Sequence, residues 1–424
     1  MLLARNSTLM RCNCPVLFAA FLLGMLAPPE AIAQWTQFGG PNQAFKADSK
    51  NLARVWPAEG PRKLWSRELG DGYSSILADG GRLYTMYRGN DKEIVVSLDA
   101  ATGKTLWEYA YDSLPCERNI EQFGRGPRAT PLLTGGRLCT IGIAGVMHCL
   151  DADTGSVLWS HDFVREFGGF GLKVCECGYS SSPIEYKDTV IALVGGKDQA
   201  IIAFSKMDGT VVWRSLDFEI NYSTPKIMKI HGEDQVVALL TTHVVGVEAN
   251  TGKLRWQFPC VNEWRENATM PVLVDANTVL ISGPAAGSRC LKITKSSGGY
   301  DVEEAWSTRK LQIYHGNSVQ LGDHIYASGG VMGPHLITAL NVRTGKTAWR
   351  KRGFGSVNLV YANGRFIILD EDGSLSLATA NPDDLTVHSQ VALLEKAAWT
   401  APTLVGTTLF VRDRSSIMAL DLSR

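Results

Sequence analysis

The sequence predicts an all-β fold, an eight-bladed β-propeller in which four-stranded antiparallel blades form a closed ring. Three observations predict it: a motif ending in tryptophan recurs, a second motif opens eight successive units, and 42 glycines beside 17 prolines indicate many tight turns. With 45% apolar and 20% charged residues, the chain is globular and can bury a large core.

The first motif combines a turn with the start of a strand. Its copies are LDAATGKTLW, LDADTGSVLW, FSKMDGTVVW, VEANTGKLRW and LNVRTGKTAW, which end at Trp107, Trp159, Trp213, Trp256 and Trp349. In all five copies a glycine precedes the tryptophan by four residues. This constant offset indicates a strand that ends on a polar residue, a tight turn that needs glycine for positive φ, and a strand that opens with a large aromatic side chain.

The second motif opens each unit. Its eight copies are Tyr73–Ser75, Arg128–Pro131, Ser181–Pro183, Ser223–Pro225, Thr269–Pro271, Asn317–Ser318, Ser356–Asn358 and Thr400–Pro402. Between an opening and a tryptophan motif lie two alternating strands, as at 81–87 and 93–98, so each unit is expected to be a four-stranded meander. Eight units over residues 60–424 average about 46 residues, the length of a propeller blade.

Two units depart from the pattern, and the two ends of the repeat region complement each other. Gly299 precedes Trp306 by seven residues, and the unit around 382–387 has no tryptophan. The last unit stops at 420–422, where its fourth strand is expected, whereas Lys63–Arg67 has fourth-strand character without three preceding strands. We therefore expect the N- and C-terminal strands to pair, which closes the ring and hides both edges.

The tryptophans of the repeats are expected to dock between neighbouring blades, as large aromatic side chains do in packed cores. This structural set is Trp65, Trp107, Trp159, Trp213, Trp256, Trp306 and Trp349. Trp35 lies outside the repeats, so it is expected to contribute much less to stability than Trp213.

Residues 1–33 have the pattern of a secretory signal peptide. Arg5 and Arg11 precede the apolar stretch Pro15–Leu26, and Ala31-Ile32-Ala33 forms a cleavage site. An uncleaved anchor is the alternative, although the apolar stretch is shorter than the roughly 20 residues of a spanning helix. The expected organisation is a signal peptide at 1–33, a leader at 34–59 and a propeller at 60–424, exported to the periplasm or cell exterior with no further membrane span.

Charge and cysteine usage limit the partners. Lys+Arg and Asp+Glu are both 42, so no basic surface for nucleic acid or an anionic membrane is expected. We expect a monomer that binds a protein partner or a small ligand in the cell envelope. Seven cysteines lie beyond residue 33, and Cys139 and Cys149 should lie opposite each other in a hairpin, either as a disulfide or as buried thiols.

The D-x-x-T-G-x-x-x-W units resemble the tryptophan-docking repeats of the pyrroloquinoline quinone (PQQ)-like propeller family, over residues 60–424. That family includes quinoprotein alcohol dehydrogenases and non-enzymatic scaffolds such as the outer-membrane protein assembly propeller. The leader 35–42 and the segments 72–75, 126–131 and 178–183 are similar to exported bacterial PQQ-like repeat proteins. The resemblance implies the fold, but one fold hosts many functions.

The resemblance leaves three functions open. A quinoprotein dehydrogenase would need a calcium or lanthanide ion held by Glu, Asn and Asp, and an Asp as base. Enzymes of that group share a disulfide between adjacent cysteines, yet this chain has no Cys-Cys pair and no Cys-x-x-Cys-His haem attachment site. We therefore expect a non-catalytic binding or assembly scaffold; a PQQ-dependent alcohol or sugar dehydrogenase and a quinone-binding module without turnover are the alternatives.

A few polar residues are candidates for ligand binding. Arg128, Asn267, His315 and Asn317 belong to blade openings that should line the central channel, and Lys197 and Asp198 lie in a turn at a rim. The alternative for each is a structural role, either lining the channel by bonding neighbouring carbonyl groups or capping a solvated turn. Partner contacts are expected on two long loops, 115–126 and 163–173, which carry Phe123, Phe167 and Phe170.

Overall fold

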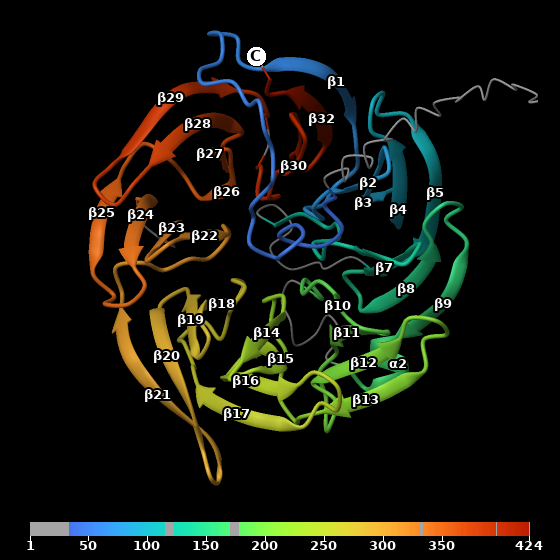
Figure 1. The fold of residues 1–424 in the computed structure, drawn as a ribbon. Helices are drawn as coiled ribbons and strands as arrows, with labels where there is room; N and C mark the ends of the chain where they lie inside the picture. The colour runs from blue at the N-terminus through green and yellow to red at the C-terminus, as the bar shows by residue number, and fades with distance from the viewer. Residues whose placement is uncertain (1–33, 115–122, 170–177, 331–333, 396, 424) are drawn as a thin grey trace, which may run out of the picture. The chain divides into compact units, whose positions relative to one another are not determined.

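The computed structural model describes residues 34–114, 123–169, 178–330, 334–395 and 397–423. The segment expected to be a signal peptide and Cys116, Cys175 and Cys177 lie outside these ranges. Within them, no helix is long and apolar enough to cross a membrane. The longest part of the chain, from residue 33 onward, forms a ring of eight four-stranded sheets (Figure 1).

Each sheet is an antiparallel meander, and we number the blades in chain order. Blades 1 to 4 consist of β2 (Leu77–Asp79), β3 (Arg82–Gly89), β4 (Lys92–Asp99) and β5 (Thr105–Asp112); β6 (Leu132–Thr134), β7 (Arg137–Ile141), β8 (Val146–Asp151) and β9 (Val157–Asp162); β10 (Ile184–Tyr186), β11 (Thr189–Leu193), β12 (Ile201–Ser205) and β13 (Val211–Ser215); and β14 (Lys226–Ile230), β15 (Glu233–Leu239), β16 (His243–Glu248) and β17 (Leu254–Pro259).

Blades 5 to 8 follow the same order. They consist of β18 (Val272–Asp275), β19 (Thr278–Gly283), β20 (Gly287–Ser296) and β21 (Gly299–Thr308); β22 (Ser318–Leu321), β23 (His324–Gly329), β24 (Leu336–Asn341) and β25 (Thr347–Lys351); β26 (Val357–Ala362), β27 (Arg365–Asp370), β28 (Ser374–Ala380) and β29 (Leu385–Ala392); and β30 (Thr403–Val405), β31 (Thr408–Arg412), β32 (Ser416–Asp421) and β1 (Arg62–Glu68). The five-residue helix α2 (Phe163–Phe167) follows β9.

The predicted closure of the ring is confirmed. β1 pairs antiparallel with β32, with Arg62 opposite Asp421 and Glu68 opposite Ser416. A buried arginine adds a second link between blades 8 and 1, because Arg412 donates hydrogen bonds to the carbonyl oxygens of Ser74 and Met86. The first and last segments of the propeller therefore hold one another, and neither presents an open edge at the junction.

The tryptophans of the fourth strands lie against the turn of the following blade. Trp65, Trp107, Trp159, Trp213, Trp306 and Trp349 donate their indole N–H groups to carbonyl oxygens of Ala100, Ala152, Lys206, Ala249, Val342 and Asn381. The turn glycine is needed at this contact: Gly155 has φ +74°, and a Cβ there would lie 2.6 Å from the Trp107 ring. Positive φ and close packing against the tryptophan of the preceding blade together explain why this turn position is glycine.

Trp256 is different. Its indole N–H donates to Oε1 of Gln235 within its own blade, at 2.7 Å. The next blade is blade 5, whose outer hairpin is built from ten-residue strands and turns at residues 297–298, just before Gly299, instead of at a T-G turn. The blade with the unusual turn near Gly299 therefore follows the blade of Trp256, which is the one docking tryptophan whose indole bonds within its own blade.

The leader does not lie beside the ring but crosses its centre (Figure 1). Trp35 forms an antiparallel bridge with Ala78 in blade 1, and further along the leader the Ala47 N–H donates to the Tyr361 carbonyl oxygen in blade 7. Trp35 is only 2% exposed. We expected Trp35 to contribute little because it lies outside the repeats. The structure places its side chain in the hydrophobic core, so position outside the repeats does not mean exposure.

The hairpin cysteines are thiols. Cys139 and Cys149 occupy paired positions of β7 and β8, as predicted, and both are buried and free, with their Sγ atoms 3.4 Å apart. Cys260 and Cys290 are also buried and free. Of the two alternatives left open for the hairpin, the structure has buried thiols.

Candidate functional site

The blade openings meet around a central cavity of about 170 Å³. Each of the eight blades contributes to its lining, and Phe38 of the leader lies on its wall. The lining residues are Phe38, Tyr73, Ser75, Phe123, Arg128, Ser180, Ser182, Tyr222, Thr224, Ala268, Tyr314, His315, Gly316, Asn317, Asn358, Trp399 and Ala401.

Hydroxyl groups of the openings link successive blades around this cavity. The Ser75 N–H donates to Thr130 Oγ1 at 3.2 Å, and the Thr130 N–H donates to Ser182 Oγ at 2.9 Å. The Ser182 N–H donates in turn to Thr224 Oγ1 at 3.0 Å. The recurring Ser or Thr before proline thus satisfies a backbone N–H of the preceding blade, which would otherwise be buried without a partner.

Aromatic rings form one side of the cavity. The rings of His315 and Trp399 are stacked, with centroids 4.6 Å apart and planes 8° apart, and Phe123 lies 5.7 Å from each. The Trp399 indole N–H donates to Glu371 Oε2, which fixes the plane of the stack. Burial lowers the pKa of His315 to about 4, so the imidazole is neutral at neutral pH.

The polar lining carries one positive charge. Arg128 donates to the carbonyl oxygens of Phe123 and Gly124, which holds the loop before blade 2 against the cavity. Among the described residues that line the cavity there is no Asp or Glu. Nor do the described ranges contain a group of three or more His, Cys, Asp or Glu side chains arranged to hold a metal ion.

The structure brings together three of the six residues proposed from the sequence as ligand contacts. Arg128, His315 and Asn317 line the central cavity. The amide group of Asn317, however, bonds the backbone N–H and carbonyl of Leu359 at 2.7 and 2.8 Å, so its polar atoms link blades 6 and 7. Asn317 therefore has the structural role that the sequence left open as the alternative.

The other three candidates lie elsewhere. Asn267 does not line the cavity; it is 3% exposed, and its amide bonds the Leu240 carbonyl oxygen and the Asn262 side chain. Lys197 and Asp198 are exposed in the turn between β11 and β12, and no ion pair joins them in the described structure. Blade-opening position alone does not determine which way a side chain points, so Asn267 could not be assigned correctly from the repeat.

In the described parts of the two loops expected to contact partners, the phenylalanine rings pack against other aromatic rings. Phe123 packs against His315 and Trp399, and Phe167 of α2 packs on Phe204, with ring centroids 5.9 Å apart. The prediction that Phe123 and Phe167 are presented to a partner is wrong, because both rings contribute to packing. Residue 170 and residues 115–122 lie outside the described ranges.

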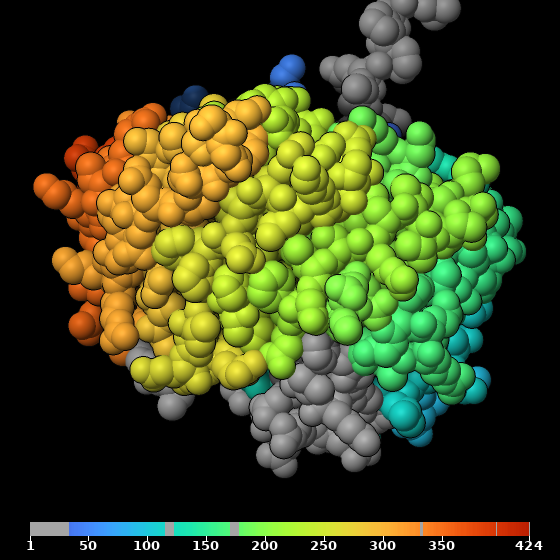
Figure 2. All heavy atoms as spheres, turned by 90° about the horizontal axis from the view of Figure 1, so that it is seen from below, coloured from blue at the N-terminus to red at the C-terminus, as the bar shows by residue number. Residues whose placement is uncertain are grey.

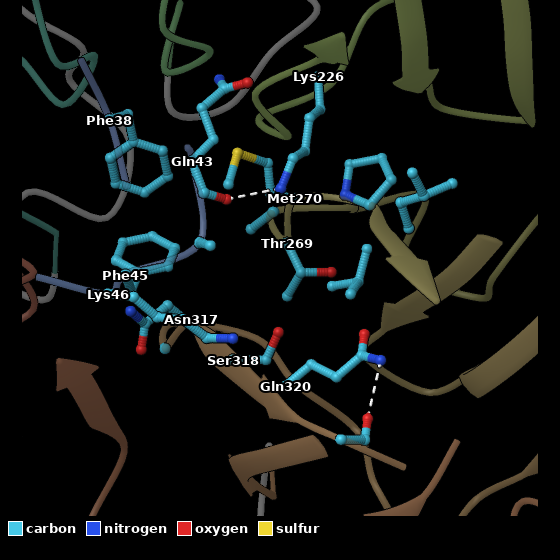
Figure 3. Close-up of a pocket in the computed structure, with 17 residues that line it drawn as sticks. Phe38, Gln43, Phe45, Lys46, Lys226, Thr269, Met270, Asn317, Ser318 and Gln320 are labelled. Carbon is cyan, nitrogen blue, oxygen red and sulfur yellow. Dashed lines mark hydrogen bonds between the residues drawn. The ribbon is translucent and has the colours of Figure 1, made fainter. Parts of the chain in front are cut away.

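Sequence reasoning missed Trp399 and a second cavity of about 380 Å³ beside the leader. Trp399 follows the only blade without a docking tryptophan in its fourth strand, which is a signal that could have drawn attention to it. Figure 3 shows this second cavity, which shares Phe38, Ala268, Gly316 and Asn317 with the central one. Residues of the leader form part of the wall of this second cavity, and the leader lies outside the repeat from which the site was predicted.

Comparisons with known proteins agree on the family. The model of the family described as outer membrane protein assembly factor BamB matches residues 90–351, more than half of the chain. BamB from Yersinia pestis is 22% identical over 379 residues, which cover 85% of this chain and 78% of that protein. The quinohemoprotein alcohol dehydrogenase ADH-IIG from Pseudomonas putida is 24% identical over 176 residues, but these cover only 37% of this chain and 24% of that protein.

Solved structures share the fold. BamB from Moraxella catarrhalis has a TM-score of 0.59 at 15% identity, covering 85% of this chain and 99% of that one. Quinohemoprotein alcohol dehydrogenase from Comamonas testosteroni has a TM-score of 0.65 at 12% identity, covering 92% and 81%. The repeat, the ring and the family match together identify the chain as a PQQ-like propeller that belongs to the family of outer membrane protein assembly factor BamB.

Proposed function

We propose that this protein is an exported, non-catalytic binding scaffold of the cell envelope that holds a protein partner on the rim of its propeller. The similarity to proteins named outer membrane protein assembly factor supports this assignment. The secretory pattern of residues 1–33 supports an envelope location, in the periplasm or at the cell exterior. Identity as low as 22% carries no particular partner over to this chain.

The observation that carries the proposal is a band of exposed apolar side chains on blades 1 to 3. Its members lie on the outer strands or in the turn before β13: Leu106, Val157, Leu158, Met207, Val211 and Val212. Val212 is 53% exposed and Leu106 46% exposed. The outer strands of blades 4, 7 and 8 carry one exposed large apolar side chain each, and those of blades 5 and 6, which are described in full, carry none.

The strands that carry this apolar band are also sheet edges. β5, β9 and β13 are each the last strand of their sheets, so one side of each backbone is unpaired. Exposed apolar side chains beside unpaired N–H and C=O groups favour the addition of an extended segment from another protein. Figure 2 views the surface of the ring from its side, with atoms from the middle of the chain, in green, yellow and orange, toward the viewer.

A quinone-dependent dehydrogenase is the second candidate, and the central cavity is the observation that favours it. A stacked His315–Trp399 pair and Arg128 suit a planar anionic ligand. The residues present do not fit the metal-dependent chemistry, because no carboxylate among the described lining residues could hold calcium or accept the alcohol proton. Binding of a planar ligand without turnover remains compatible with the scaffold.

Photo-crosslinking in the native cell envelope tests the scaffold. A photoreactive amino acid at position 212 should give one defined crosslinked product, and the same amino acid at position 303, on the exposed face of β21, should give none. Leu158→Asp should abolish the product at position 212, because it places a charge in the apolar band without touching the core. Equal products at both positions, or a product that survives Leu158→Asp, would contradict the proposal.

A further inference from the structure

The leader encloses a cavity that the central site does not use. The cavity lies between the leader and strands β14, β18 and β22, and has a volume of about 380 Å³. Figure 3 shows Lys226 entering it from blade 4 and Lys46 entering it from the leader. Two parts of the chain that are 180 residues apart in sequence therefore place ammonium groups in the same space.

These two lysines lack a negative partner. Neither forms an ion pair in the described structure, and no Asp or Glu lines the cavity among the described residues. The Lys226 ammonium donates to the Gln43 carbonyl oxygen at 2.8 Å, which leaves further N–H donors. Lys229, on the same strand, differs: its Nζ lies 2.8 Å from Asp234 Oδ1.

The local electrostatics favour an added anion. Burial and the nearby positive charge of Lys46 lower the pKa of Lys226 to about 8, so the folded protein disfavours the charged form in this cavity. Burial also lowers the pKa of Lys46. An anion between the two ammonium groups would replace lost hydration and remove their mutual repulsion.

The rest of the wall combines polar groups with an apolar area. Phe45, Met270, Val272 and Leu273 line it, and Phe45 is 3% exposed. This surface suits a hydrocarbon body better than a fully hydrated inorganic ion. We propose that the leader cavity binds a small organic carboxylate, whose carboxylate group pairs with Lys226 and Lys46 and whose hydrocarbon part packs against Met270 and Phe45.

The two lysines of this site belong neither to the rim nor to the lining of the central cavity, so its test does not depend on the scaffold assignment. Isothermal titration calorimetry of the purified mature protein with hexanoate, benzoate and succinate should give saturable binding by at least one of them at up to about 10 mM. Acetate, which lacks the hydrocarbon part, and hexanamide, which lacks the charge, should bind more weakly. Inorganic phosphate that binds as tightly as the best carboxylate would overturn the organic-anion assignment.

Matched lysine variants locate the site. Lys226→Met should weaken binding at least about tenfold, because methionine keeps the length of the side chain but removes the charge. Lys46→Met should also weaken binding, and it changes a side chain at an exposed position. Lys229→Met, on the same strand, and Lys50→Met, further along the leader, should bind like the original protein. No saturable binding by any of the three carboxylates, or unchanged binding in both Lys226→Met and Lys46→Met, would overturn the proposal.

Discussion

The indole N–H of Trp213 donates a hydrogen bond to the carbonyl oxygen of Ala249, 3.2 Å away in the next blade. The ring of Trp213 also packs on Gly252, where a Cβ would lie 2.4 Å from it. One side chain therefore provides apolar contact and a hydrogen bond across a blade boundary, and similar pairs recur around the ring. The repeat is thus a device for joining blades as well as for building them.

Truncating one of these tryptophans should destabilise the ring. Trp213→Ala should lower the free energy of unfolding by roughly 3–5 kcal/mol, because it removes a large buried aromatic ring and leaves a cavity. Equilibrium denaturation in urea measures this change. Trp264→Ala is the control, since Trp264 is 38% exposed and should cost far less. Equal losses for the two variants would contradict the inter-blade role.

The packing of Trp35 in the leader should stabilise the fold as much as the packing of a docking tryptophan in a blade. Because Trp35 is 2% exposed and its backbone bridges blade 1, Trp35→Ala should cost roughly 3–5 kcal/mol, similar to Trp213→Ala. The same urea experiment compares them directly. If Trp35→Ala unfolds at the same urea concentration as the original protein, the leader does not occupy the centre of the ring in solution.

Closure of the ring predicts a strong effect from a short truncation. Deleting residues 417–424 removes most of β32, so β1 loses its partner and β31 becomes an open edge. We expect a melting temperature lower by many degrees, or aggregation, measured by calorimetry and light scattering. Deleting residues 423–424, which follow the buried Leu422, is the control and should have a much smaller effect. Identical melting of the two proteins would argue against closure.

Acid should destabilise the protein through His315. Its pKa is lowered to about 4, so between about pH 4 and 6.5 the unfolded chain binds more protons than the folded one, and stability falls as pH falls through this window. The loss between pH 7.5 and pH 5 should be about 1–2 kcal/mol larger in the original protein than in His315→Gln. Urea unfolding at the two pH values measures it. The same loss in both proteins would mean that His315 is not held neutral by burial.

The blades and their closure into a ring could be predicted from the sequence repeat, whereas the path of the leader, which lies outside the repeat, could not. Eight openings, the constant glycine-to-tryptophan offset and the truncated last unit were enough for the blade count and the closure by β1 and β32. The path of the leader could not be predicted, because its contacts with Ala78 and Tyr361 are long-range pairings without a local pattern.

Site residues were predicted less well for a related reason. The openings indicated the channel, but hydrogen bonds across blade boundaries decide whether an asparagine such as Asn317 offers its amide to a ligand or to the Leu359 backbone. Lys226 had a usable signal: it follows an opening proline at the position where other blades have Leu132, Ile184 and Val272. A charge at an otherwise apolar strand position was informative, yet its partner Lys46 became visible only with the leader in place.

The most direct test of the claim that the propeller is a non-catalytic scaffold is an assay of dye-linked alcohol oxidation. The assay uses the purified mature protein supplied with PQQ and calcium. We expect no turnover on ethanol, glucose or another polyol, because the described lining of the central cavity has no carboxylate to act as base or metal ligand. Stoichiometric PQQ binding without turnover would agree with this account. Turnover that chelator abolishes, or that Asp198→Ala removes, would contradict it and make the protein a quinone-dependent dehydrogenase.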